Sequence, residues 1–226
     1  MPTLYHSVSS RSFRPLWAME ELGLKYELKM LGFPPRAVAP AYLDENPLGT
    51  VPLFIDGAVR MSESAAICEY LAARNLPNSL HVAADEPDFG AYLNYLHFGE
   101  TTLTWPQAIA LRFTRFEPDE RKNPQLASDY QRWFLSRLRT LEPLLSRQDH
   151  VCAKGFTAAD ISVGYALMLA NLIGFSDKFK PAVLAYWQRL QAREGFQRAL
   201  AVEDKAARAQ GVDPTPAPLA GSTPAV

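Results

Sequence analysis

Serine hydroxyls gather ahead of a predicted helix near the start of the chain. In "HSVSSRSFRP", residues 6–15, Pro15 suits the first turn of a helix and Ser12 suits its cap, which leaves Ser9 and Ser10 in the preceding loop. The free amides and the positive dipole end of a helix start can bind an anion. The hydroxyls therefore indicate either plain helix capping or a polar binding site.

A second group of polar residues precedes another predicted helix, in "MSESAAI". Ser62 or Glu63 suits the cap of this helix, and Ser64 is its first residue. Each start taken alone is typical of ordinary capping, because serine is common at such positions. The two starts form a candidate site only if the fold brings them together.

A proline lies near the start of a short apolar stretch, "GTVPLFIDG". Its role bears on whether the fold brings the two helix starts together. Within a sheet a proline is confined to edges, bulges or the first residue of a strand, and Pro52 fits the last of these. The bond before it is either trans, in a plain strand start, or cis, as at some binding sites. Asp56-Gly57, between two apolar runs, predicts a hairpin that this strand opens.

Strand-like and helical segments alternate over residues 1–78, which predicts a small α/β domain with a mixed four-stranded sheet. The loop after the first strand and the segment after Pro52 can then meet at one end of the sheet, where α/β folds bind ligands. The expected strands are 3–7, 25–31, 51–55 and 58–61, and the expected helices are 14–24, 40–45 and 64–74.

The chain changes to a helical pattern from about residue 85. Asn123 followed by Pro124 indicates one helix start, and Thr157 with Asp160 is typical of a capping box ahead of an apolar, buried helix.

These patterns predict two domains and a tail. The α/β domain is expected at 1–78 and an all-helical domain at 85–208. Residues 211–226 are rich in proline and small residues, so we expect them to be disordered.

The composition is that of an ordinary globular protein, with 48% hydrophobic and 21% charged residues. The formal net charge is -1, which offers no electrostatic footprint for nucleic acid or an anionic membrane. No basic-then-apolar leader begins the chain, and its longest apolar run is shorter than the ~20 residues of a membrane span. We expect a cytoplasmic protein that binds neither nucleic acid nor membrane.

The residue types that bind metals are scattered along the chain. Cys68 and Cys152 lie far apart and in no C-x-x-C pattern, which argues against a disulfide scaffold, a metal knuckle or a redox dithiol. We therefore predict no metal and two buried cysteines. Metal-ligand spacing is also absent from the four histidines, His6, His81, His97 and His150.

Four segments together resemble the soluble, bacterial-type glutathione S-transferases: "LYHSVSSRSFRPLWAMEELGLKYEL", "NPLGTVPLFIDG", "SESAAICEYL" and "GFTAADISVG". No single segment is specific, but they occur in the order and spacing of that family and cover residues 3–200. The resemblance implies a thioredoxin-like N-terminal domain, an all-α C-terminal domain and a homodimer.

The resemblance also implies which residues contact glutathione. Pro52 resembles the family's cis proline, and the Val51 backbone would bond the cysteinyl part of glutathione as an added strand does. Glu63 and Ser64 resemble the acid-serine pair that holds the γ-glutamyl end. The chain departs from the family at Thr50, where a lysine is common.

That departure leaves the glycyl carboxylate of glutathione without its usual basic partner. Arg36 is the candidate substitute, with Thr50 beside it in the expected binding segment.

The thiol-activating residue is a serine in this type of relative, four residues before a basic residue of the first helix. Counting back from Arg14 gives Ser10, and Ser9 is the alternative. His6 ends the first strand and Tyr5 lies inside it, so neither fits this role. No cysteine lies nearby, which argues against the reductase activity of cysteine-type relatives.

The chemistry expected of the serine is modest. A thiol with a pKa of about 8.5 is only ~3% thiolate at pH 7. A hydrogen bond to the charged sulfur contributes roughly 1.5 to 3 kcal/mol, which lowers the thiol pKa by about one to two units. The serine donates this bond, and glutathione itself is the nucleophile.

An apolar site for the electrophile is expected in the helical domain, within "YLHFGETTLTWPQAIALRF". Pro106 would kink this helix, and the candidate lining residues are Leu103, Trp105 and Phe113. Aromatic residues at helical spacing are equally typical of a core or a dimer interface.

The predicted function is a glutathione transferase or lyase, which joins glutathione to a small hydrophobic electrophile or cleaves an ether or halide bond. The alternatives are a glutathione-dependent isomerase and a non-catalytic binding or regulatory protein of the same fold. An enzyme is favoured by the joint occurrence of Ser10, Pro52, Glu63 and Ser64. A purely structural relative needs only the proline and a helix cap.

Overall fold

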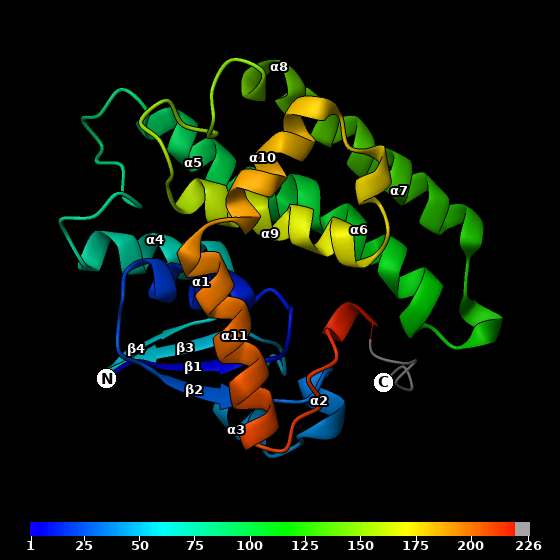
Figure 1. The fold of residues 1–226 in the computed structure, drawn as a ribbon. Helices are drawn as coiled ribbons and strands as arrows, with labels where there is room; N and C mark the ends of the chain where they lie inside the picture. Colours follow the sequence, from blue (N-terminus) through cyan, green and yellow to red (C-terminus); the bar gives the residue numbers. More distant parts are fainter. Residues whose placement is uncertain (220–226) are drawn as a thin grey trace. The chain divides into compact units, whose positions relative to one another are not determined.

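The computed structural model describes residues 1–219 of the chain. Their contacts divide them into two compact units: residues 1–78 with 193 onward, and residues 79–192. The first unit contains the sheet and the second is helical (Figure 1). The predicted helical domain at 85–208 is therefore divided, because its last helix belongs to the first unit.

The first unit is built on a mixed sheet of four strands, as predicted, and the strand order is β2-β1-β3-β4. β1 pairs parallel with β2 and antiparallel with β3, which in turn pairs antiparallel with β4. The hairpin between β3 and β4 turns at Gly57, whose φ of 59° suits glycine. The strand bounds are β1 (Thr3–His6), β2 (Glu27–Met30), β3 (Leu53–Asp56) and β4 (Val59–Met61).

Helices α1 and α4 lie on one side of this sheet (Figure 1). On the other side, Tyr42 of α3 packs with Tyr5, Val51 and Leu53. Helix α2 was not predicted from the sequence. The helices of the unit are α1 (Phe13–Glu21), α2 (Pro35–Val38), α3 (Tyr42–Glu45), α4 (Ser64–Arg74), α11 (Glu194–Ala209) and the 3-10 turn η6 (Ala217–Leu219).

Helix α11 joins the first unit because its apolar face packs on α1. The ring of Phe196 lies 4.9 Å from the ring of Trp17 and 5.5 Å from that of Phe13, both edge-on. All three side chains are buried. Arg193, just before α11, donates to both carboxylate oxygens of Glu21, at 2.8 and 2.9 Å.

The segment after α11 is ordered as far as residue 219, which corrects the prediction of disorder from 211 onward. The Ala217 amide donates to the Val8 carbonyl at 2.9 Å, and Ala217 and Pro218 are buried. This backbone bond and the burial of small apolar groups hold the segment in place. The rest of the predicted tail, residues 220–226, lies outside the described residues.

The second unit consists of helices. A π-helical segment, η1, lies directly before α6, which has Pro106 in its first turn. The elements are α5 (Phe89–His97), η1 (Phe98–Thr104), α6 (Trp105–Leu111), the π-helical η2 (Arg112–Phe116), the 3-10 turn η3 (Asp119–Arg121), α7 (Pro124–Leu138), the 3-10 turn η4 (Arg139–Leu141), α8 (Glu142–Leu145), α9 (Ala158–Leu172), the 3-10 turn η5 (Ser176–Lys178) and α10 (Pro181–Gln191).

Two predicted helix starts are confirmed in this unit. The Asn123 side chain accepts from the Leu126 amide at 3.0 Å at the start of α7. Thr157 and Asp160 form the capping box of α9, whose first thirteen residues are all buried.

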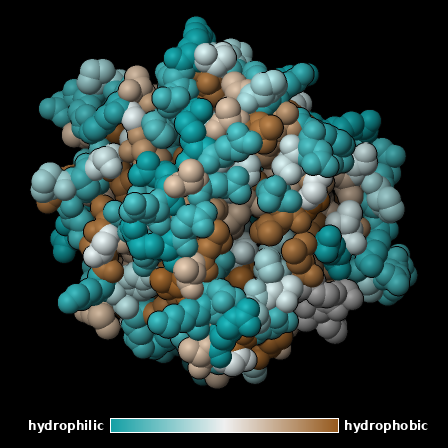
Figure 2. Space-filling model, viewed as in Figure 1, coloured by the Kyte–Doolittle hydropathy of each residue, from teal (hydrophilic) through white to brown (hydrophobic). Residues whose placement is uncertain are grey.

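Hydrophilic residues predominate on the molecular face drawn in Figure 2, with hydrophobic residues interspersed among them. Within residues 1–219, no helix combines the length and apolar character needed to cross a membrane.

Candidate functional site

The loop between β1 and α1 carries the serines singled out in the sequence. Ser9 has a φ of 55°, unusual for a residue with a side chain. The Ser10 amide donates to the Ser7 carbonyl, and the Phe13 amide donates to the Ser10 carbonyl, so backbone bonds lead into α1. Ser12 occupies the cap position as predicted, but its hydroxyl makes no capping bond.

The Ser12 hydroxyl instead belongs to a buried side-chain network. It lies 2.6 Å from His6 Nδ1 and 2.7 Å from the Ser10 hydroxyl. On the other side of the imidazole, His6 Nε2 lies 2.9 Å from Glu203 Oε2 of α11. Glu203 also accepts from the Ser9 amide at 2.9 Å and from the Ser9 hydroxyl at 3.2 Å.

The second helix start differs from a plain cap as well. Glu63 occupies the cap position of α4, but its side chain makes no capping bond and is exposed. The Ser64 hydroxyl accepts from Arg14 Nη1 at 3.1 Å, and both residues are buried. Arg14 of α1 therefore links the two starts, so the fold does bring them together.

The Val51-Pro52 peptide bond is cis, the sharper of the two alternatives for Pro52. Val51 is only 9% exposed, and its amide and carbonyl have no hydrogen-bond partner among residues 1–219. The Thr50 carbonyl, one residue earlier, accepts from the Tyr42 hydroxyl and from Asn46 Nδ2, both at 2.8 Å. A fixed strand start thus presents unpaired backbone groups, which buried positions rarely tolerate without a ligand or water.

Sheet register places this strand start beside the serine loop. Tyr5 pairs with Leu53 in the antiparallel ladder, so β1 ends at the edge of the sheet where β3 begins. The loop after β1 and the segment before β3 therefore leave the same edge, as the sequence predicts.

Arg36 lies next to the segment that precedes the cis proline. Gly49 has a φ of 61°, and a Cβ on it would lie 2.7 Å from the Arg36 Cβ. The backbone of α2 thus packs directly on the residue before Thr50, while the Arg36 side chain is exposed. Its guanidinium is available to an anionic ligand at that edge.

Neither cysteine is suited to nucleophilic chemistry. Both are free and buried. Burial raises the pKa of the Cys68 thiol in α4 to about 12, against the opposing effect of the Arg14 charge. Burial likewise raises the pKa of Cys152 to about 11. Both thiols stay protonated at neutral pH.

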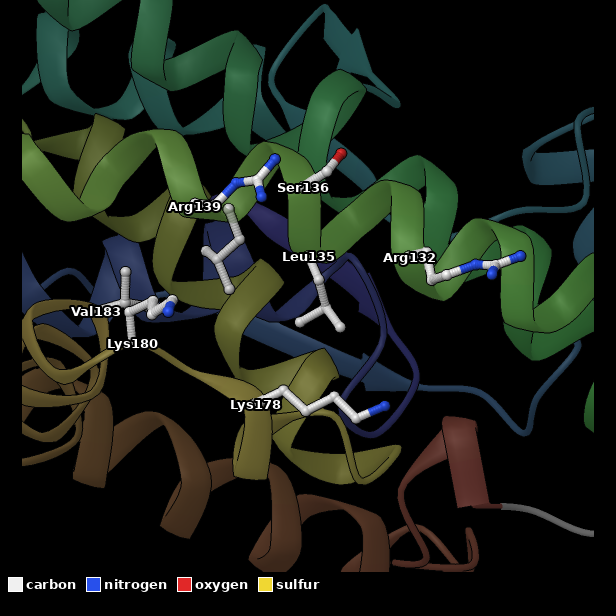
Figure 3. Close-up of a pocket in the computed structure, with 8 residues that line it drawn as sticks. Arg132, Leu135, Ser136, Arg139, Lys178, Lys180 and Val183 are labelled. Atoms are coloured by element: carbon white, nitrogen blue, oxygen red, sulfur yellow. The ribbon is translucent and has the colours of Figure 1, made fainter.

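The predicted electrophile-site residues are not alike in the structure. Leu103 has no exposed surface and is a core residue of the helical unit, Trp105 is 58% exposed, and Phe113 is half-buried. A cavity of about 260 Å³ in this unit is lined by none of them (Figure 3). Its lining residues are Arg132, Leu135, Ser136, Leu138, Arg139, Lys178, Lys180 and Val183.

Sequence reasoning missed His6 and Glu203 as parts of the site. The sequence does contain a sign that Glu203 is buried. It falls on one face of a helix with Phe196, Ala199 and Ala207, at steps of three or four residues. A carboxylate on the buried stripe of an amphipathic helix requires a partner. His6, at the end of β1, is a natural one, but only tertiary structure joins residues so far apart.

Within residues 1–219, no three His, Cys, Asp or Glu side chains gather as they would around a metal ion.

The fold is that of a two-domain protein with a thioredoxin-like sheet domain, in which a cis proline precedes β3. Residues 2–73 match the family profile "Glutathione S-transferase, N-terminal domain". This match identifies a glutathione S-transferase N-terminal domain in the first unit, and the chain is similar to glutathione S-transferases over most of its length.

The individual relatives to which the chain is similar are glutathione S-transferases. The chain is 36% identical over 103 residues to glutathione S-transferase 3 of Schizosaccharomyces pombe, a match that spans 46% of this chain and 43% of that protein. It is 25% identical over 201 residues to glutathione S-transferase A of Pleuronectes platessa, covering 87% of this chain and 89% of that one.

Among solved structures, the chain is similar to the glutathione transferase URE2P6 of Phanerochaete chrysosporium in complex with oxidized glutathione. The TM-score is 0.78 at 26% identity, over 91% of this chain and 97% of that one.

Proposed function

We propose that this protein is a glutathione transferase that binds glutathione at the start of β3 and activates its thiol as a thiolate. The observation that carries the proposal is the buried Val51 backbone, unpaired within the described residues, at the sheet edge that also bears the serine loop. An extended tripeptide would satisfy this backbone as an added strand does. The binding of oxidized glutathione by the similar URE2P6 supports the ligand.

The two ends of glutathione find complementary groups in the first unit. The Glu63 carboxylate, not used as a cap, would pair with the γ-glutamyl ammonium. Ser64 accepts from Arg14, so its own hydroxyl proton can donate to the γ-glutamyl carboxylate at the start of α4. Arg36, beside Gly49 and Thr50, would meet the glycyl carboxylate.

Ser10 is the proposed donor to the glutathione sulfur. The Ser9 hydroxyl donates to Glu203, which directs it away from a ligand. Ser10 lies nearer the surface, at 7% exposed. The thiolate then attacks a small hydrophobic electrophile, to form a conjugate or to release a leaving group.

The resemblance to the family further supports a homodimer in the cytoplasm. Trp105 is an exposed aromatic residue of the helical unit, suited either to the electrophile site or to the dimer contact.

Calorimetric titration of glutathione tests the proposal, together with the ultraviolet thiolate band followed against pH. We expect saturable binding and a bound-thiol pKa below its usual value. Absence of binding would favour a regulatory protein of the same fold. Substrate loss with total thiol unchanged would instead indicate an isomerase.

Glu63→Ala separates binding from capping. Loss of a charge-assisted hydrogen bond of about 1.5 to 3 kcal/mol weakens glutathione binding roughly ten- to hundredfold, with little change in the unfolding midpoint. Glu69→Ala, farther along α4, is the matched control and leaves binding unchanged. Equal damage to affinity and stability in Glu63→Ala would favour plain capping.

A further inference from the structure

The buried network in the first unit is a continuous chain of hydrogen bonds that reaches the surface at one end. Glu203, His6, Ser12 and Ser10 follow one another with heavy-atom distances of 2.9, 2.6 and 2.7 Å. His6 and Ser12 have no exposed surface, and Ser10 is the most exposed member. Each link holds one proton, so the number of protons on the His6 imidazole sets the donor and the acceptor in every link.

The hydrogen-bond chain has two alternative states, which differ in the number of protons on the His6 imidazole. With a neutral imidazole, Nε2 donates to Glu203 and Nδ1 accepts from Ser12. Ser12 then has no second proton, so the short contact to Ser10 requires that Ser10 donates to Ser12. In this state the Ser10 oxygen is left as an acceptor toward a ligand.

The second state has one more proton on the imidazole. His6 then donates from both nitrogens, to Glu203 and to Ser12. Ser12 in turn donates to Ser10, and the Ser10 proton turns outward. The Ser7 amide, 3.3 Å from the Ser12 oxygen, donates to it in either state. Only this second state lets Ser10 donate to a thiolate.

We propose that the thiol proton of bound glutathione moves along this chain and comes to rest on His6. The thiol proton passes to the Ser10 oxygen, the Ser10 proton passes to the Ser12 oxygen, and the Ser12 proton passes to His6 Nδ1. Three O–H or N–H bonds form while the S–H bond and two O–H bonds break. The products are a thiolate that accepts from Ser10 and an imidazolium paired with Glu203.

His6 acts through two hydroxyls and does not touch the sulfur, so we assign it as a positioning residue and proton acceptor. The arrangement of nucleophile, base and orienting carboxylate is one that activates nucleophiles generally. Glu203 orients the imidazole and supplies the negative charge that an imidazolium requires at a buried position. The two donors of Ser9 hold that carboxylate in place.

Other charged groups near β1 are engaged elsewhere. Arg14 of α1 donates to Ser64, and Lys29 of β2 donates to the Tyr5 phenol at 3.3 Å. Glu203 of α11 is the ionisable group that bonds directly to His6 among the described residues.

Proton release on binding tests the proposal, which rests on the proposed function. Glutathione is titrated into the full chain by calorimetry at pH 7 in buffers of different ionisation enthalpy, and the thiolate band is recorded on the same samples. We expect thiolate to form with almost no proton released, because His6 retains it. S-methylglutathione, which has no thiol proton, gives the baseline.

Ser12→Ala cuts the chain while it retains both Ser10 and His6. We expect it to bind glutathione with less than a tenfold change in affinity, to lose most of the thiolate at pH 7, and to shift the thiolate titration to higher pH. Ser7→Ala removes a hydroxyl of the same loop that lies off the chain, near the Gly32 carbonyl, and is the matched control. Glu203→Gln is a second variant should Ser12→Ala not fold, and the same shift is expected.

One released proton for each thiolate formed by the unaltered protein would overturn the relay. An unchanged thiolate titration in folded Ser12→Ala or folded Glu203→Gln would do so too. Failure of both glutathione and S-methylglutathione to bind would instead overturn the proposed function itself.

Discussion

The starts of α1 and α9 contain similar groups and use them differently. Each combines a hydroxyl, a buried carboxylate and a histidine, and the histidine at α9 is His150, whose Nδ1 lies 3.6 Å from Asp160 Oδ1. At α9, the Asp160 carboxylate accepts from the Val151 and Thr157 amides and from the Tyr186 hydroxyl, so the network is closed on the protein. At α1, the hydrogen bonds continue from Glu203 through side chains to a serine near the surface.

The two helix starts show how a structural cap can be distinguished from a candidate site. A capping box uses its polar side chains on backbone donors that would otherwise be unpaired. At α1 backbone bonds supply the turn, and the Ser12 hydroxyl is left to bond another side chain. A polar residue in a cap position that does not cap is therefore the stronger sign of function.

The largest expected effect follows from opening the closed network. Asp160→Ala leaves two buried amides and the Tyr186 hydroxyl without an acceptor, so we expect the free energy of unfolding to fall by about 3 kcal/mol or more. Urea unfolding followed by circular dichroism measures this, with the exposed Asp177→Ala as control. A loss below ~1 kcal/mol would contradict the structural role of this network.

Removing the end of the open chain is expected to affect chemistry and not stability. Ser10→Ala lowers kcat about ten- to hundredfold, because one hydrogen bond to a charged sulfur is lost. The unfolding midpoint should stay within the range typical of surface substitutions. Turnover that survives intact would exclude Ser10 as the donor and leave Ser9 as the alternative.

Removing a side chain that does cap its helix should have a smaller and purely structural effect. Asn123→Ala removes the acceptor of the Leu126 amide and costs about 1 kcal/mol of unfolding free energy. Asn123→Asp keeps an acceptor and recovers most of that loss. Thermal unfolding of the two variants measures this difference in unfolding free energy. Both variants should bind glutathione with the same affinity. A lower affinity in Asn123→Ala would show that this position is more than a cap.

The smallest effect is expected at the cysteines, one in each unit. Burial raises the pKa of Cys68 to about 12 and that of Cys152 to about 11, from an ordinary value of 9.0. An aromatic disulfide reagent should therefore label neither thiol at pH 8 until urea is added. Rapid labelling of the native protein would show that the thiols are accessible.

The same pKa values give the pH dependence of stability. Because the folded state holds the thiol protons more tightly than the unfolded state, this contribution is intact below about pH 9 and is lost as the pH rises toward 11 or 12. Serine substitution at either position should remove that part of the alkaline loss of stability, which unfolding measured at pH 8 and pH 10.5 can detect.

Local patterns in the sequence predicted most of the fold. The four strands, the hairpin and α4 could be read from alternation and turn residues, because each depends on neighbours in the chain. The Asn123 cap and the capping box of α9 are local in the same sense. Contacts across the chain could not be read, so the placement of α11 and of residues 211–219 was wrong.

In the candidate site, too, the residues in recognisable local segments could be predicted, and the residue that depends on distant contacts could not. Pro52, Val51, Glu63 and Ser64 sit in recognisable segments, and the structure places them at helix or strand starts as expected. His6 was set aside because its place in a strand suggested no role.

Glu203 lies late in the chain, so it is synthesised well after the serine loop that it contacts. It stands 194 residues after Ser9, so at ordinary rates of translation it follows the serine loop by about 10 to 40 s. During that interval the nascent chain has its first strand and helix but no carboxylate for the His6 imidazole. The loop proposed to activate the thiol is therefore expected to be completed only near the end of synthesis. A chain truncated before α11 would carry every residue of the proposed glutathione-binding edge and still lack the carboxylate that pairs with His6.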